Sequence, residues 1–236
     1  MKKLALLVAA ALAVCSLPAN AVVVNSGDIG FTGVTGIQGR IDGNVQPGLT
    51  GTLGLTYTGL SNGGLTYNFL YNVTNTSSAP ITASRISSFA FQTNPNIVSA
   101  SSTGVYNDPS LPANGYPGFL PGTVEFCLGS SPGTCTGGDG VIKGQSAAGT
   151  FALTFATALS SIDLQTAYFR FQSIVGGVGG DSGAGFNSNI VVINPNLVET
   201  PLPGAVWLFG SVLGAVFGGK KLRDLKNKRK AKLVIA

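Results

Sequence analysis

The chain has 236 residues, enough for one domain of β-sandwich size or for two small ones. Only 10% of the residues are charged, 34 are glycine, 12 are proline and none is histidine. The lack of histidine excludes Ser-His and Cys-His nucleophile pairs, histidine general bases and histidine metal ligands. The formal charge of +5 would favour an anionic partner only if the basic residues were spread through the folded part.

The N-terminus has the pattern of a secretory signal peptide. Lys2 and Lys3 precede an apolar run of about the right length, and Ala19 and Ala21 form an Ala-x-Ala cleavage site. We therefore expect export and cleavage after Ala21, with residues 1–21 as the signal peptide.

Cys15 lies close to the end of this apolar run and admits a second reading. Leu12 to Cys15 resemble the lipobox of a lipoprotein, but Val14 stands where such boxes carry a small residue. We interpret Cys15 as part of the signal peptide that is removed.

A second topogenic segment lies near the C-terminus. Sixteen apolar or small residues separate Pro203 from Lys220, and as a helix they span only about 24 Å. Against the roughly 30 Å of a bilayer core this predicts a short membrane anchor, with a buried core helix as the alternative. The tail, residues 220–236, holds eight Lys or Arg residues and one Asp, so the positive-inside rule places it in the cytoplasm.

The segment 200–211, TPLPGAVWLFGS, resembles the PEP-CTERM sorting signal in its VPLPA-type variant, with an apolar stretch and a basic end after it. Thr200 and Gly204 replace the Val and Ala of that variant. The resemblance implies a bacterial protein processed at the proline motif by an exosortase, a membrane protease or transpeptidase, and a link to exopolysaccharide and biofilm. The residues that carry it are Pro201, Leu202, Pro203 and Trp207.

Between the two terminal segments the net charge is negative, opposite in sign to that of the whole chain. Residues 22–199 contain four basic and eight acidic residues, a net charge of −4. A nucleic-acid partner would need clustered Lys and Arg, so none is expected. The four basic residues are isolated in the sequence: Arg40, Arg85, Lys143 and Arg170.

The pattern of residues 22–199 predicts an all-β fold, an antiparallel β-sandwich or jelly roll with little helix. Over residues 65–73 apolar side chains alternate with a period of two, and Gly and Asn in residues 59–64 suit the hairpin loop before them. The face so formed is Leu65, Tyr67, Phe69, Tyr71 and Val73. Further strands are expected at residues 53–58, 85–91, 97–101, 124–128, 149–155, 167–174 and 189–193.

Cys127 and Cys135 are the two cysteines left after removal of the signal peptide. In an exported chain, two cysteines across a Pro-Gly turn predict a disulfide. Without histidine, neither a metal site nor a catalytic thiol is expected. The residues after Cys135 are similar to the "cistern" group of PEP-CTERM proteins, a resemblance that implies no established activity.

Two segments rich in glycine or proline have patterns that are also found in ligand-binding loops. Residues 176–181, GGVGGD, match one unit of a calcium-binding β-roll, but such rolls need tandem copies, so a flexible loop is preferred here and at Asp139. Residues 101–122 are rich in Pro and Gly and predict a long surface loop, either ligand-binding or an ordinary crossover.

Two carboxylates at a suitable separation would suffice for glycoside hydrolysis, and the available pairs are Asp28 with Asp42 and Glu125 with Asp163. Neither pair sits in a recognisable motif, so no catalytic residue is assigned.

These patterns predict a non-enzymatic envelope or extracellular-matrix protein without cofactor or metal. The expected divisions are residues 1–21, a β-domain 22–199, a sorting motif and membrane helix 200–219, and a cytoplasmic tail 220–236. The expected partners are an exosortase, the inner membrane as a transient anchor, and a polysaccharide. The alternatives are an adhesin or carbohydrate-binding module, with Tyr106 and Tyr116 stacking on sugar rings, and a glycan-active enzyme using Glu125 and Asp163.

Overall fold

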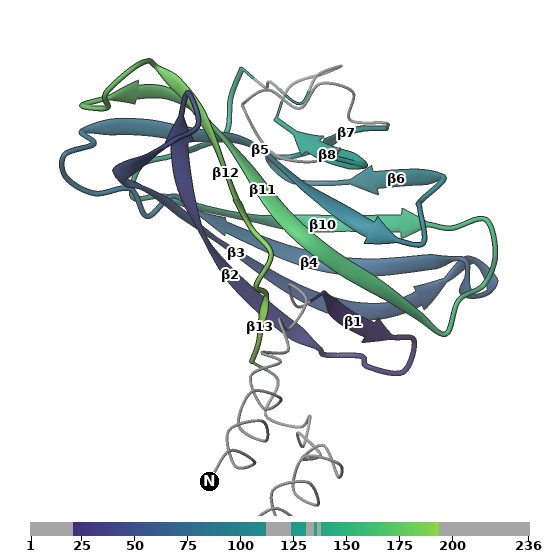
Figure 1. The fold of residues 1–236 in the computed structure, drawn as a ribbon. Coiled ribbons are helices and arrows are strands. Elements are labelled where there is room, and N and C mark those ends of the chain that lie inside the picture. The colour runs from purple at the N-terminus through teal and green to yellow at the C-terminus, as the bar shows by residue number, and fades with distance from the viewer. Residues whose placement is uncertain (1–20, 112–123, 131–134, 136–137, 194–236) are drawn as a thin grey trace, which may run out of the picture. The chain divides into compact units, whose positions relative to one another are not determined.

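A computed structural model describes residues 21–111, 124–130, 135 and 138–193 (Figure 1). The described residues form thirteen strands and one short 3-10 helix, η1 (Asn62–Gly64). The strands are β1 (Val22–Asn25), β2 (Thr32–Ile41), β3 (Asn44–Ser61), β4 (Thr66–Thr74), β5 (Ala83–Asn94), β6 (Ser99–Ser102), β7 (Asp108–Ser110), β8 (Phe126–Gly129), β9 (Val141–Ile142), β10 (Ser146–Thr154), β11 (Ser161–Val175), β12 (Ser182–Asn187) and β13 (Val191–Val192).

All thirteen strands belong to one antiparallel sheet. Its main path is β6-β10-β4-β3-β2-β12-β11-β5-β8-β7, with β1 beside β11, β13 beside β2 and β9 beside β5. The two ends of the path, β6 and β7, approach each other, so the sheet is nearly closed. The predicted all-β antiparallel fold is confirmed, and its sandwich-like layers are continuous through the β2-β12 pair (Figure 1).

Strand β4 shows how the sequence pattern sets the fold. Its inward side chains Tyr67, Phe69, Tyr71 and Val73 are each at most 2% exposed, whereas Leu70 between them is 47% exposed. This is the predicted alternation of a strand with one buried face. The predicted hairpin loop is also present, with positive φ at Asn62, Gly63 and Gly64.

Aromatic rings fill the space between the layers. Phe89 of β5 lies 5.1 Å from Tyr71 of β4 and 6.2 Å from Phe151 of β10, measured between ring centroids. Phe151 in turn stacks on Phe69 at 4.9 Å. Rings of this size, offset or edge to face, supply much of the buried apolar area and therefore of the stability.

Inward glycines allow the layers to approach closely. A Cβ at Gly51 of β3 would lie 2.6 Å from Ile86 of β5 and 2.7 Å from Phe169 of β11. Cβ atoms at Gly183 and Gly185 of β12 would overlap backbone carbonyl oxygens of β2. The β2-β12 pair that joins the layers therefore depends on residues without side chains.

Inward glycines also explain why the sequence pattern did not predict β2. Strand β2 buries Gly33, Thr35, Ile37, Gly39 and Ile41, a set with too few large apolar residues to give a clear period of two. The strands that the sequence missed are β1, β2, the first half of β3, β7, β9 and β12.

The surface loop predicted for residues 101–122 is only partly right over its described part, where residues 103–107 connect two strands and are exposed except for Tyr106. Residues 99–102 form β6, residues 108–110 form β7, and Tyr106 between them is fully buried. The second half of that segment lies outside the described residues.

The described chain begins and ends at one end of the domain. Tyr57 Oη donates to the carbonyl oxygen of Ser26, just after β1, and the Ile193 amide donates to that of Thr32, at the start of β2. Thr32 is paired with Thr56, next to Tyr57. Within the ranges given above no helix is long and apolar enough to cross a membrane, and the predicted membrane segment 200–219 and tail 220–236 lie outside them.

Candidate functional site

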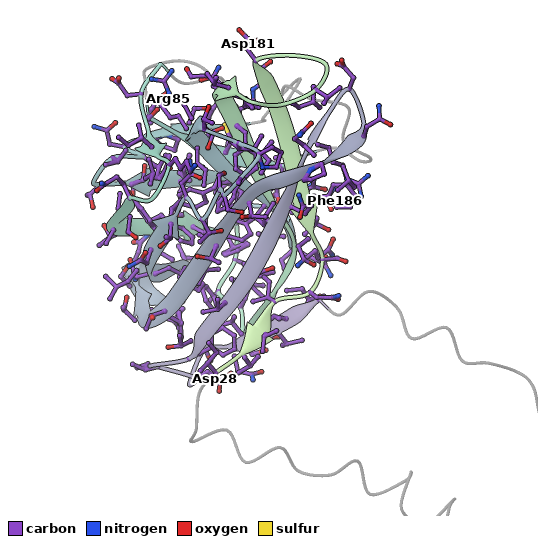
Figure 2. All side chains as sticks on the ribbon, turned by 90° about the vertical axis from the view of Figure 1, so that its left-hand side faces the viewer. Asp28, Arg85, Asp181 and Phe186 are labelled. Atoms are coloured by element: carbon purple, nitrogen blue, oxygen red, sulfur yellow. A yellow bond between two sulfur atoms is a disulfide. The ribbon has the colours of Figure 1, made fainter. Side chains whose placement is uncertain are left out.

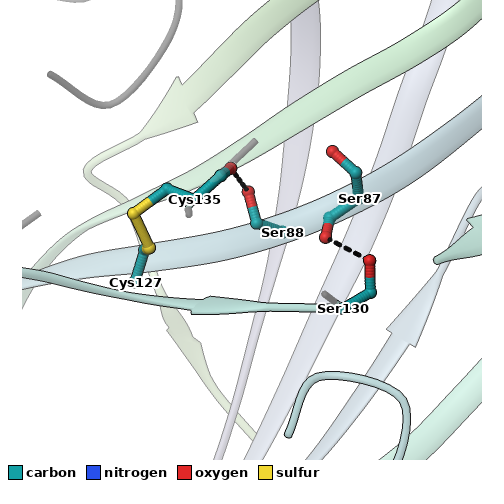
Figure 3. Close-up of a disulfide and its surroundings, with 5 residues drawn as sticks. All are labelled: Ser87, Ser88, Cys127, Ser130 and Cys135. Atoms are coloured by element: carbon teal, nitrogen blue, oxygen red, sulfur yellow. Dashed lines mark hydrogen bonds between the residues drawn. A yellow bond between two sulfur atoms is a disulfide. The ribbon is translucent and has the colours of Figure 1, made fainter. Parts of the chain in front are cut away.

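The predicted disulfide is present (Figure 3). It joins Cys127 of β8 to Cys135, whose Cα atoms are 5.8 Å apart. Ser88 Oγ donates to the Cys135 carbonyl oxygen at 2.6 Å, which ties the second cysteine to β5. The cysteines pack with Ala90, Val124 and Tyr168 in a small second core. The disulfide is a structural element of this layer.

The residues predicted for sorting and for signal cleavage fall almost entirely outside the described part of the chain. Ala21 is exposed and directly precedes β1. The predicted residues outside the described ranges are Ala19, Pro201, Leu202, Pro203 and Trp207.

Tyr106 is not the exposed sugar-stacking residue that the sequence suggested. It is 0% exposed, its hydroxyl donates to the Ile86 carbonyl oxygen at 2.8 Å, and its ring meets Phe89 edge on at 5.2 Å. Tyr116 lies outside the described residues. The other described tyrosines are buried as well: Tyr57, Tyr67, Tyr71 and Tyr168. The described tyrosines therefore offer no platform for a sugar ring.

The carboxylates proposed for hydrolysis hold the backbone instead. Glu125 accepts hydrogen bonds from the Thr93 amide at 3.0 Å, from the Thr93 hydroxyl and from the Ile97 amide. Asp163 accepts a hydrogen bond from Asn94 Nδ2 at 3.3 Å. Both acids thus fasten the end of β5, which is a structural role.

The second pair of acids lies in turns. Asp28 Oδ2 accepts hydrogen bonds from the Asn25 amide at 2.9 Å and from Asn25 Nδ2 at 2.8 Å, closing the turn after β1. Asp42 has a φ of 49° in the tight connection between β2 and β3. The two residues therefore serve local turn geometry.

The glycine-rich segment 176–181 is the turn between β11 and β12. Asp181 is exposed, and its carbonyl oxygen accepts a hydrogen bond from the Ile174 amide at 2.9 Å. Asp139 is exposed too. Among the residues that the structure describes, no three potential metal ligands gather at one place.

Two basic residues that are isolated in the sequence meet at one pocket. Arg85 of β5 is paired with Ile142 of β9, and Lys143 follows directly. The Lys143 amide donates to the Ser84 carbonyl oxygen at 2.9 Å, which fixes the turn after β9 against β5. The pocket has a volume of about 470 Å³ and is lined by Thr82, Ala83, Ser84, Arg85, Ile142, Lys143, Gly144 and Ser173.

The hydrogen bonds of these two cations go to neutral oxygens. Arg85 Nη2 donates to Ser173 Oγ at 3.1 Å, and Lys143 Nζ donates to the Ile81 carbonyl oxygen at 2.6 Å. Arg85 Nε is buried and has no hydrogen-bond partner within the described ranges. The pocket is therefore lined by two positively charged residues, in a domain whose net charge is negative.

A second depression, of about 560 Å³, lies on the outer face of β3, β4 and β10. It is lined by Leu70 and by small or hydroxyl side chains, such as Thr56 and Thr150. No charged residue lines it. It lacks the convergent polar groups that distinguish a ligand site from a shallow sheet face.

The pocket at Arg85 and Lys143 is therefore the candidate site. It was not predicted from the sequence, because only the strand pairing brings these two residues together. Comparison with known proteins adds no family to this geometry. No protein-family model matches the chain, and no curated protein has a matching sequence.

Proposed function

We propose that the chain is an exported, exosortase-sorted bacterial protein of the cell envelope or extracellular matrix, and that its β-domain acts by binding. The observation that carries this proposal is the PEP-CTERM-like segment 200–211 followed by an apolar stretch and a basic tail. The signal-peptide pattern of residues 1–21 supports export. The apolar stretch holds the chain in the inner membrane until the exosortase acts.

The limits of the folded domain support this division. Val22, the first residue after the predicted cleavage site, begins β1 and is 7% exposed, and Val24 is 0% exposed. Strand β1 pairs with β11 from Val22 onward, so ordered pairing is already present at the first residue after the predicted cleavage site. The Cys127–Cys135 disulfide suits an oxidising compartment outside the cytoplasm.

The arrangement of polar groups supports a role without catalysis. Hydrolysis of a glycoside needs two carboxylates free to act on opposite sides of one bond. Glu125 and Asp163 are instead engaged with the ends of strands, and the chain has no histidine to serve a nucleophile. An adhesin built on exposed tyrosines is disfavoured for the described part of the chain, because Tyr106 is buried.

The test is the mass of the mature protein in cells with and without an exosortase. With the enzyme, we expect the N-terminus at Val22 and loss of the residues that follow the cleavage point in the proline motif. Without it, the N-terminus is unchanged and the full C-terminus is retained. A full C-terminus in both strains would contradict sorting by an exosortase.

Variants sharpen this test. Pro203→Ala lies inside the motif and should leave the full C-terminus in place even when the exosortase is present. Pro195→Ala lies before the motif and serves as the matched control, with normal processing. Equal processing of the two variants would show that the motif is not what the enzyme reads.

A further inference from the structure

We propose that the pocket at Arg85 and Lys143 binds a carboxylate-bearing sugar residue of an acidic polysaccharide. The inference rests on the proposed function, because it names the ligand class of an exported matrix protein. It is argued from the charges, the restrained Arg85 guanidinium group and the apolar rim of this pocket.

The first argument is charge. Arg85 and Lys143 are two of the four basic residues between positions 22 and 199, and they line the same pocket. Their hydrogen bonds go to the Ser173 hydroxyl and the Ile81 carbonyl oxygen, both neutral. An anion in this pocket would be attracted by both residues, and a partly buried site weakens that attraction less than bulk water does.

The second argument is the guanidinium group of Arg85. Its Nη2 donates to Ser173 Oγ at 3.1 Å, which restrains the planar group at the pocket. A planar guanidinium matches the two oxygens of a carboxylate, and restraining it beforehand reduces the entropy lost when an anion binds.

The third argument is the remainder of the lining. Ile142, which is 57% exposed, and Ala83 line the pocket with apolar side chains, while Thr82 and Ser173 contribute hydroxyl groups. A pocket of about 470 Å³ with an apolar wall is larger than a lone carboxylate or phosphate requires. A uronic acid supplies an apolar ring face, hydroxyl groups and one carboxylate, and so uses all parts of the site.

The site is placed where a polymer can reach it. Arg85 lies near the end of the domain that also carries Asp181, and Asp28 lies at the opposite end (Figure 2). The pocket spans the surface of β5, the turn after β9 and β11, where Ser173 is exposed.

The experiment is a calorimetric titration of the full purified chain with trigalacturonate. Arg85→Gln and Lys143→Gln should each weaken binding by about tenfold, equivalent to about 1.4 kcal/mol. The matched control is Arg40→Gln, which removes the same charge from β2. Arg40 donates to the Gly43 carbonyl oxygen and lies over the Phe186 ring, so this variant should keep the affinity of the unaltered protein.

Fully methyl-esterified trigalacturonate tests the carboxylate and should not bind measurably. The basic tail is common to all variants, so differences between them report on the pocket. Thermal unfolding of each variant checks the fold, and Lys143→Gln carries the test if Arg85→Gln is unstable.

Three results would overturn the inference. Equal affinity in Arg85→Gln, Lys143→Gln and Arg40→Gln would mean that the pocket is not the binding site. Displacement of trigalacturonate by inorganic phosphate at equal concentration would reduce the site to a simple anion site. If Arg85→Gln weakened binding to vesicles of anionic phospholipid but did not change binding to trigalacturonate, the pocket would be assigned to a membrane surface. Each result leaves the exosortase test unaffected, so the two proposals fail separately.

Discussion

Replacing Gly149 by alanine should destabilise the domain strongly. Gly149 lies on β10 opposite Tyr71 of β4. A Cβ there would overlap the Thr103 carbonyl oxygen and lie 2.5 Å from Tyr71 Oη. These two oxygens are joined by a hydrogen bond of 2.8 Å, so the added methyl group must break that bond or push β10 away from β4.

The expected magnitude follows from two contributions. Overpacking a close-packed site costs about 1–3 kcal/mol. Leaving a buried hydroxyl or carbonyl group without its partner costs about 1–3 kcal/mol more. Since neighbours relax in part, we expect a loss of about 3 kcal/mol, which for a domain of this size lowers the Tm by roughly 6–12 °C.

The assay is thermal unfolding followed by circular dichroism, with Gly36→Ala as the matched control. Gly36 lies on β2, is exposed, and a Cβ there would meet nothing within 4 Å. That substitution should be neutral or stabilise the domain by up to about 1 kcal/mol, because alanine loses less conformational entropy than glycine in a strand. Equal effects of Gly149→Ala and Gly36→Ala would refute the close-approach argument.

Three further predictions concern the disulfide, the Glu125 carboxylate and the loss of stability at alkaline pH. Replacing Cys127 and Cys135 together by alanine should lower the free energy of unfolding, measured by urea unfolding, by about 2.5 kcal/mol. This is the loop entropy that the disulfide removes from the unfolded chain when it joins two residues eight positions apart. Glu125→Gln should lower the free energy of unfolding by about 1–3 kcal/mol, because an amide has one acceptor oxygen and cannot serve both Thr93 and the Ile97 amide, and an unchanged urea midpoint would contradict its structural role. Burial raises the pKa of Tyr57 from 10.0 to about 12, so the folded state holds its proton longer than the unfolded state does. The contribution of protonated Tyr57 to the free energy of unfolding is therefore complete below pH 10 and is lost as the pH rises from 10 to 12. Tyr57→Phe should reduce this loss of stability, measured as Tm in a series of melting curves at increasing pH.

The sequence predicted strands well where large side chains alternate. In β4 the four buried residues from Tyr67 to Val73 are aromatic or β-branched, so the pattern is visible without any tertiary information. In β2 the same alternation is present, but Gly33 and Gly39 occupy inward positions. Their identity is set by the close approach of Ile190 and Leu49, which no local pattern contains.

The candidate site was harder to predict than the fold for a related reason. A Pro-rich and Gly-rich neighbourhood predicts an irregular backbone, but it does not say where an aromatic side chain such as Tyr106 points. Burial of that ring against Phe89 gains more than exposure would, and its hydroxyl still finds a backbone acceptor at Ile86. The meeting of Arg85 and Lys143 depends on the β5-β9 register, which is a long-range property of the sheet.

The position of the first and last described residues also determines where the domain can be immobilised or labelled. Strands β1 and β13 bring the start and the end of the described chain to the end that carries Asp28, away from Arg85 (Figures 1 and 2). A bead, sensor surface or fluorescent tag joined directly at Ala21 or at Ile193 is therefore attached away from the pocket. Both attachment points should report the same affinity for a ligand at Arg85, and a ligand that binds near Asp28 should be sensitive to the tether.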